Sequence, residues 1–173
     1  VIAQPNNPTG ETLFCSAPNS SHYLGELNES LLGKAKEAID NSSGISLVSR
    51  ICNTDRSVGA MLSGYIADKH GNQGMAADPV VIELHGTAGQ SFGVWNAGGL
   101  EMTIVGDAND YVGKGMAGGK LVVRPPLGSS FVSHKATIVG NTCLYGATGG
   151  KLFAAGCAGE RFAVRNSGVQ AVV

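Results

Sequence analysis

The second half of the chain repeats a glycine pattern every twenty residues. Residues 86–105 align with residues 106–125 through the identical pairs Gly86/Gly106, Ala88/Ala108, Gly93/Gly113, Ala97/Ala117, Gly98/Gly118 and Gly99/Gly119. The pattern restarts at Gly140 and at Gly156, after an insertion at about 125–139 and a shortened turn at 140–155. A unit this short cannot close a hydrophobic core alone, so the copies must stack on one another.

Each repeat unit ends in a run of residues that is typical of a β-strand. The runs are Leu100–Val105, Lys120–Arg124, Lys151–Ala155 and Gln170–Val173. In the first run apolar Leu100, Met102 and Ile104 alternate with polar residues, which is the period of a half-buried strand. Stacked copies place strand above strand at ~4.8 Å. The sequence therefore predicts a mainly β fold, a single-stranded right-handed parallel β-helix with two N-terminal helices.

Composition limits what such a chain can bind. Glycine is 26 of 173 residues, and 18 of these lie in residues 86–173, which suits a backbone that turns sharply and often. The net charge is −1, so no overall field favours nucleic acid or an anionic membrane surface. The longest apolar runs, such as Leu121–Val123, are far shorter than the ~20 residues of a membrane helix. We expect a soluble globular protein without nucleic-acid or membrane partners.

The chain divides into three parts. Residues 1–25 mix proline with Asn, Ser and Gly, which predicts an extended arm or linker. Residues 26–85 are expected to hold two helices and short strands that lead into the coils of residues 86–173. The last apolar run, Val169–Val173, has no polar cap after it, so we expect a β-helix truncated at its C-terminus. Its open end would let copies of the chain associate.

Local signals place the two expected helices. The first runs from Leu27 with Asn28 as a possible N-cap, and the second follows Ser57 as N-cap and ends at Gly71. Short strands are expected at 45–52 and 80–84.

Two glycine motifs resemble nucleotide-binding loops. Gly113–Gly118 matches G-x-G-x-x-G, but that motif must open a helix, and here a strand-like run follows. Its glycines recur in the repeat at Gly93 and Gly98, which favours corners of the coils over a cofactor site. Gly146–Lys151 hints at a phosphate loop, yet Leu152 stands where the magnesium-binding hydroxyl belongs, so we exclude it.

Few polar residues are candidates for chemistry. Asp107, Asn109 and Asp110 could bind calcium, but the same residue types stabilise turns, and we favour the turn. Asp55 and Arg56 stand together at a helix start, where a buried ion pair or an interface contact is favoured over catalysis.

Histidines and cysteines are scattered along the chain. They are His22, His70, His85 and His134, and Cys15, Cys52, Cys143 and Cys157. No C-x-x-C pair indicates a zinc or iron–sulfur site, which favours free buried thiols in a reducing compartment. We expect the histidines to be surface or hydrogen-bonded residues. No catalytic, cofactor-binding or metal-binding residue is expected in this chain.

Four segments carry a resemblance to a known family. They are Asn53–Gly59, Gly86–Gly93, Gly106–Gly113 and Gly156–Asn166. They closely resemble the C-terminal β-helix (GXGXG) domain of the glutamate synthase large subunit. The resemblance extends from about Glu26 to Val173, and residues 1–25 carry no part of it.

The resemblance implies a role within a larger enzyme. The parent would release ammonia from glutamine in an amidotransferase domain and add it to 2-oxoglutarate in a synthase domain that holds FMN and a 3Fe-4S cluster. The nucleophilic N-terminal cysteine is missing, because the first residue is Val1, and so are the clustered cysteines of the cluster. The resemblance thus implies a non-catalytic scaffold that holds no cofactor and packs against both catalytic domains, in the cytoplasm or in a plastid if from a plant.

Two other functions stay open. A β-helix subunit of a formylmethanofuran dehydrogenase would share the repeat, although Asn53–Gly59 and Gly106–Gly113 look closer to the synthase. A polysaccharide-acting β-helix would present rows of aromatic and acidic side chains, and aromatic residues are only 6% of this chain. The electron donor of the parent enzyme is not encoded in this part.

Overall fold

The computed structural model describes residue 10 and residues 25–75 and 78–173. The arm expected over residues 1–25 therefore lies, apart from Gly10 and Gly25, outside the described residues.

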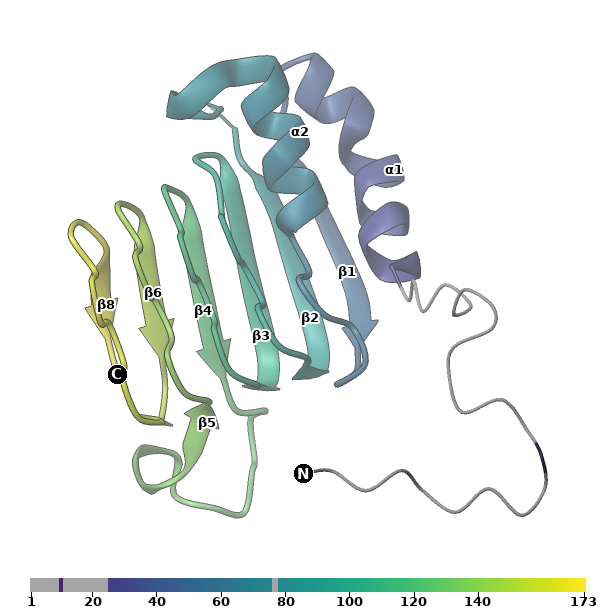
Figure 1. Ribbon diagram of the computed structural model, residues 1–173. Helices are drawn as coiled ribbons and strands as arrows, with labels where there is room; N and C mark the ends of the chain where they lie inside the picture. The colour runs from purple at the N-terminus through teal and green to yellow at the C-terminus, as the bar shows by residue number, and fades with distance from the viewer. Residues whose placement is uncertain (1–9, 11–24, 76–77) are drawn as a thin grey trace.

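The described chain forms one open parallel sheet with two helices against it (Figure 1). In chain order the elements are α1 (Glu26–Asp40), β1 (Ile45–Ile51), α2 (Ala60–His70), the 3₁₀ turn η1 (Gly71–Gln73), β2 (Val80–Ala88), β3 (Leu100–Ala108), β4 (Lys120–Arg124), the 3₁₀ turn η2 (Ser133–Lys135), β5 (Thr137–Val139), β6 (Lys151–Ala154), β7 (Cys157–Ala158) and β8 (Gln170–Val172). The main strand order is β1-β2-β3-β4-β6-β8, and β5 pairs with β3 and β7. The predicted mainly β fold with two N-terminal helices is confirmed.

The core lies along the inner face of this sheet. Apolar side chains stack in register from strand to strand, as in the row Leu47, Ile82, Met102, Leu121 and Leu152. All but Leu47 are at most 1% exposed. The alternation predicted for β3 is confirmed, because Leu100, Met102 and Ile104 are buried whereas Glu101 and Thr103 are half-buried. Stacked rows of this kind remove apolar surface from water and so stabilise the fold.

The strand register departs from the twenty-residue repeat by one position. Val80 pairs with Leu100, twenty residues on, but Met102 pairs with Leu121, nineteen residues on. A slip of one residue would turn Leu121 away from the core, so burial of the apolar row sets the register. The short strands β5 and β7 were not predicted, since three-residue and two-residue elements carry no periodic signal.

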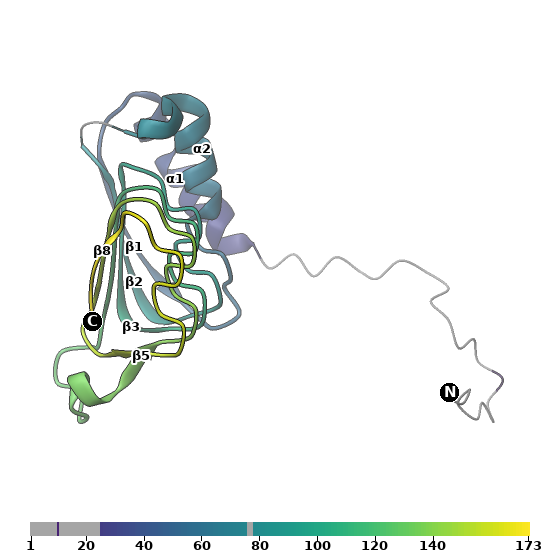
Figure 2. The same cartoon turned by 60° about the vertical axis from the view of Figure 1, so that its left-hand side comes forward.

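Between strands the backbone runs through four similar return segments, residues 89–99, 109–119, 140–150 and 159–169. Seen from the end of the sheet their traces nearly overlay (Figure 2). Positive φ angles recur at alternate positions, namely Ser91, Gly93, Trp95, Tyr111, Gly113, Gly115, Thr142, Leu144, Gly146, Arg161, Ala163 and Arg165. Backbone bonds join neighbouring segments, as where Gly113 N donates to Phe92 O at 2.8 Å. Each segment thus supplies the hydrogen-bond partners of the next.

The helix caps predicted from the sequence are wrong. Asn28 lies inside α1, where it is buried; its Nδ2 donates to Arg56 O at 3.2 Å and its Oδ1 accepts from Gly59 N at 3.1 Å. Ser57 precedes α2, but its carbonyl rather than its hydroxyl accepts from Ala60 N at 3.1 Å. Tertiary contact therefore recruits the Asn28 side chain, and a backbone carbonyl takes the place of the Ser57 hydroxyl. The predicted stop at Gly71 is confirmed, with φ at 69°.

The two helices pack against each other at one end of the sheet. Leu31, Ala35 and Ile39 of α1 and Leu62 and Ile66 of α2 are buried in the core cluster. At the rim of this contact the hydroxyl of Tyr65 donates to Asp40 Oδ1 at 2.7 Å. This hydrogen bond to a carboxylate is the main cause that raises the pKa of Tyr65 to about 12, so the phenol keeps its proton at neutral pH.

Candidate functional site

The motif Gly113–Gly118 forms a turn that leads into β4 and opens no helix. A Cβ atom added at Gly118 would lie 2.6 Å from Gly98 N, so the two corners are in backbone contact. The positive φ angles lie one residue later, at 85° for Gly99 and 70° for Gly119. The interpretation of these glycines as corner residues is confirmed.

The acidic turn Asp107–Asp110 uses its side chains within the fold. Asp107 accepts a hydrogen bond from the Thr87 hydroxyl at 2.5 Å, and Asp110 Oδ1 accepts from Asn141 N at 2.7 Å. Asn109 Oδ1 accepts from Asp110 N at 2.7 Å. These bonds tie three successive units together, and the Asn109 bond is a local side chain-to-backbone contact of the turn type that the sequence favoured.

The pair Asp55 and Arg56 does not form a buried ion pair, which was one of the two contacts expected, the other being an interface contact. Asp55 Oδ2 accepts from Cys52 N at 2.8 Å and closes the turn that follows β1. Arg56 is exposed, and among the described residues no ion pair includes it. The Asp55 carboxylate is therefore used to close this turn.

The cysteines are less buried than expected. Cys52 and Cys157 are exposed, Cys143 is buried, and Cys15 lies outside the described residues. Burial is the main cause that raises the pKa of Cys143 from 9.0 to about 11. Its thiol is therefore protonated and unreactive at neutral pH, because the thiolate is the nucleophile.

This difference predicts the labelling pattern of the thiols. At pH 8, a maleimide should label Cys52 and Cys157 in the native protein but Cys143 only after unfolding. A raised thiol pKa stabilises the fold below pH 9.0, and this contribution should fall as the pH rises through about 11. Peptide mapping by mass spectrometry identifies each labelled residue. Labelling of Cys143 in the native protein as fast as that of Cys157 would contradict the burial.

The histidines serve separate local contacts, as expected. His70 Nε2 lies 2.9 Å from Ile39 O, and His85 Nε2 lies 2.7 Å from Glu83 Oε1, while His134 is exposed and His22 lies outside the described residues. Within residues 25–75 and 78–173, no group of three His, Cys, Asp or Glu side chains is arranged to hold a metal ion. None of the helices in that same part is long and apolar enough to cross a bilayer.

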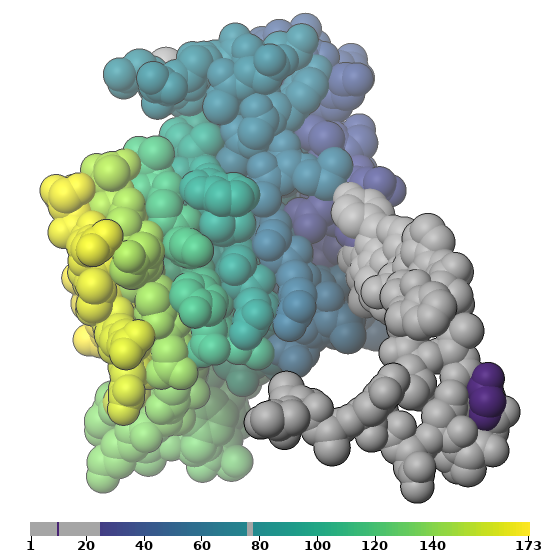
Figure 3. Space-filling view, viewed as in Figure 1, coloured from purple at the N-terminus to yellow at the C-terminus, as the bar shows by residue number. Residues whose placement is uncertain are grey.

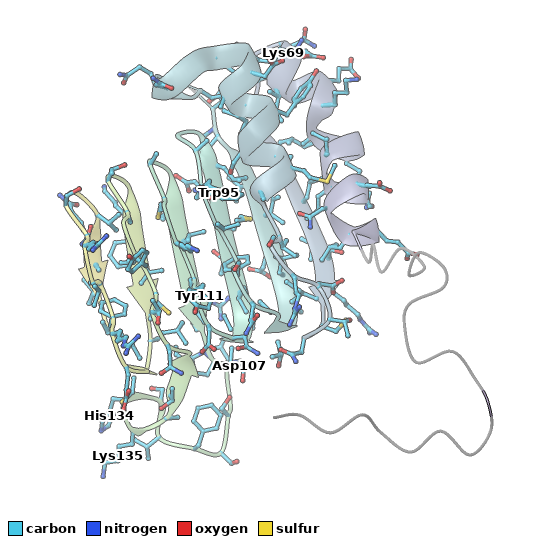
Figure 4. The ribbon with its side chains drawn as sticks, in the orientation of Figure 1. Lys69, Trp95, Asp107, Tyr111, His134 and Lys135 are labelled. Carbon is cyan, nitrogen blue, oxygen red and sulfur yellow. The ribbon has the colours of Figure 1, made fainter. Side chains whose placement is uncertain are left out.

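The most distinctive surface is the outer side of the return segments, which we call the return face. It carries the aromatic and cationic side chains Trp95, Tyr111, Lys114, Tyr145 and Arg165. Figure 4 shows Trp95 and Tyr111 on this face, below α2. Figure 3 shows the same face in a space-filling view. The sequence analysis missed it. One signal was present, because Trp95 aligns with Gly115 in the repeat and breaks its pattern.

Two hollows border the return segments and the sheet. A groove of about 470 Å³ lies between α2 and the return face, with Trp95 at its side. A second hollow, of about 570 Å³, lies between the ends of β2 and β3 and the insertion, and its polar lining includes His85, Thr87 and Asp107. Both are open to solvent, and no pair of carboxylates is found among the described residues that line either one.

Comparison with known proteins identifies relatives. Glutamate synthase (NADH) of Saccharomyces cerevisiae is 48% identical over 173 residues, which are 99% of this chain and 8% of that protein. Glutamate synthase (NADPH) large chain of Azospirillum brasilense is 43% identical over 96% of this chain and 11% of its own length. Ferredoxin-dependent glutamate synthase 1, chloroplastic/mitochondrial, of Arabidopsis thaliana is 53% identical over 79% of this chain and 8% of its own length.

These matches extend the resemblance noted in the sequence. The chain spans about a tenth of the length of these relatives. Similarity to the yeast protein includes most of residues 1–25, in which no resemblance was found from the sequence. The family described as the GXGXG motif matches residues 28–173. The chain therefore belongs to the GXGXG motif family and corresponds to a small part of glutamate synthase large chains.

Proposed function

We propose that this chain is the non-catalytic scaffold domain of a glutamate synthase, which forms glutamate from glutamine and 2-oxoglutarate. The observation that carries the proposal is the family match over residues 28–173 together with 48% identity to a glutamate synthase. FMN and a 3Fe-4S cluster would be held by the rest of the parent enzyme, and this chain would hold no cofactor. The names of the relatives differ in their electron donor, so the donor is not assigned.

The proposed architecture is a right-handed parallel β-helix. Every described strand pair is parallel, β2 and β3 are each followed directly by a return segment, and neighbouring return segments are hydrogen-bonded to each other. Parallel crossovers in one sheet are right-handed in nearly all proteins. In this proposal residues 1–25 are an arm, residues 26–85 lead into the β-helix, and residues 86–173 form the coils of the β-helix.

A scaffold role agrees with how the polar side chains are used. Asp55, Asp107 and Asp110 bind backbone or neighbouring hydroxyl groups. The function would then lie in shape and in contacts with the amidotransferase and synthase domains of the parent subunit. The free edge of β8, whose residue Val172 is 59% exposed, offers unpaired backbone groups to a further strand or to a second copy. The location would be the cytoplasm, or a plastid in a plant.

The test lengthens the scaffold within the full-length enzyme. Duplication of residues 86–105 adds one coil and increases the separation of the elements on either side by ~4.8 Å. Glutamine hydrolysis and ammonia-dependent glutamate formation should each be retained, whereas glutamine-dependent glutamate formation should fall. The coupled activity needs a fixed distance between the domains, but the half-reactions do not.

A matched control inserts glycine and serine residues after Leu127. This residue is 94% exposed in the insertion, so added residues there leave the stacked units unchanged. The control should keep the coupled activity. Full coupled activity in the duplicated enzyme would contradict the scaffold proposal.

A further inference from the structure

Trp95 projects from the return face and makes little contribution to the core. Its side chain is 64% exposed, although it is the only tryptophan of the chain. A Cβ atom added at Gly115 would lie 2.8 Å from Trp95 Cδ1, so the indole covers this glycine of the next unit. Its φ of 55° is in the left-handed region, which a bulky residue rarely adopts. The same φ region recurs at this position in every return segment, so it belongs to the fold, and the exposure of a large aromatic side chain is what favours contact with a partner.

The groove beside Trp95 suits the close approach of another backbone. Its α2 wall is formed by small residues one helical turn apart, Ala60, Ser63, Gly64 and Ala67. Its opposite wall is formed by Ala97, Ala117 and Thr148 of successive return segments. No charged side chain lines it. An extended peptide can therefore lie along the groove with an apolar side chain against the indole.

The return face beside the groove carries two cations. Trp95 N donates to Lys114 O at 2.8 Å, and Arg165 occupies the position that Trp95 and Gly115 occupy in their own segments. Lys114 Nζ lies 5.4 Å from the ring centre of Tyr111, and the Arg165 guanidinium lies 5.8 Å from that of Tyr145. Among the described residues neither cation pairs with a carboxylate. Two cations held over aromatic rings without a counter-ion favour an anionic partner.

Among the described residues, no carboxylate of the return segments forms an ion pair with these cations. Asp110 and Glu160 lie at the second position of their segments, whereas Lys114 and Arg165 lie at the sixth and seventh. Asp110 is also bound to Asn141 N. The α2 carboxylate Asp68 does not line the groove.

We propose that the groove beside Trp95 docks an extended acidic segment of another domain of the same subunit. The relatives are about ten times longer than this chain, so most of the subunit lies outside it. The indole would bury an apolar side chain of that segment, and Lys114 and Arg165 would pair with its carboxylates. This inference rests on the proposed function and names one of the surfaces through which the scaffold would act.

Hydroxyl-radical footprinting of the full-length subunit tests the burial of Trp95. Each oxidation rate is divided by the rate for the same residue in the urea-unfolded subunit. Trp95 should then be as protected as Phe92, which is 0% exposed. The double variant Lys114→Glu/Arg165→Glu should raise its oxidation to that of an exposed residue. The control Lys135→Glu/Lys151→Glu makes the same charge change at exposed positions away from the groove and should leave the protection unchanged.

Carbodiimide cross-linking tests the acidic partner, because it joins an amine to a carboxylate in direct contact. A cross-linked peptide that joins Lys114 to an Asp or Glu outside these 173 residues is the expected product. A Trp95 that is oxidised freely in the intact subunit overturns the proposal. Three other results also overturn it. They are protection of Trp95 that survives the charge reversal, cross-linking of Lys114 to Asp110 alone, and protection of Trp95 that appears only when single-stranded nucleic acid is added.

The outcome is separable from that of the coil duplication. If Trp95 is exposed while duplication abolishes coupling, the scaffold proposal stands and this docking surface is wrong. If Trp95 is protected through Lys114 and duplication leaves coupling intact, the surface stands and the spacing role is wrong.

Discussion

Gly118→Ala is expected to lower the free energy of unfolding by roughly 2 kcal/mol or more, as clashes with backbone do. The added Cβ atom would lie 2.6 Å from Gly98 N and 2.8 Å from Gly98 Cα. Neither atom can move aside as a flexible side chain would, because Gly98 itself belongs to a stacked corner. To remove this clash, the two stacked units would have to move apart, although their strands pair in register. Urea denaturation followed by circular dichroism measures the loss.

Gly33→Ala is the matched control. Gly33 lies in α1, and an added Cβ atom would meet no atom within 4 Å. Alanine there should stabilise the protein by up to ~1 kcal/mol, because it favours the helix over glycine. Equal unfolding midpoints for the Gly118→Ala variant and the unmodified protein would remove the argument that the corners need glycine.

Leu121→Ala should cost about 3 kcal/mol, within the range measured for buried leucines. The side chain is 0% exposed and stands in the apolar row between Met102 and Leu152. Removing it leaves a cavity that the paired strands on both sides cannot close. Val48→Ala is the control, because Val48 is 70% exposed on β1, and it should change the stability by less than ~0.5 kcal/mol.

Leu121 also explains a glycine of the repeat. A Cβ atom at Gly93 would lie 2.5 Å from Leu121 Cδ1, so Gly93→Ala should destabilise through both this clash and its φ of 65°. In the Leu121→Ala background only the backbone strain remains, about 1 kcal/mol. The double variant should therefore be more stable than the sum of the single effects predicts. Additive effects in a double-mutant cycle would contradict the coupling.

Much of the fold could be predicted because the repeat is regular. The strand β4 was predicted with the bounds it has, and the starts of β1, β2, β3, β6 and β8 agree. Hydrophobic alternation in β3 marked its buried face correctly. The predicted N-caps were wrong because they depend on tertiary contacts and not on the repeat. Asn28 and Ser57 have the right residue type for an N-cap, but Asn28 is used by a contact across 31 residues with Gly59, which local signals do not contain.

The candidate site was the least predictable part. Trp95, Lys114 and Arg165 are separated in sequence, and only the stacking of return segments brings them onto one face. The substitution of tryptophan for the repeat glycine could have drawn attention to residue 95. It could not have shown that α2 forms the second wall of a groove beside it.

The sequence by itself determined the repeat, the inward apolar residues and the glycine corners, because these depend on residue types at short, fixed spacings. The tertiary structure decided the register of β4, the use of Asn28 and the exposure of Trp95. Each of these depends on which distant backbone groups and side chains compete for the same space. The buried apolar rows stay aligned although the spacing between units differs. Leu121 therefore pairs with Met102, nineteen residues earlier in the chain, although the glycines repeat every twenty residues.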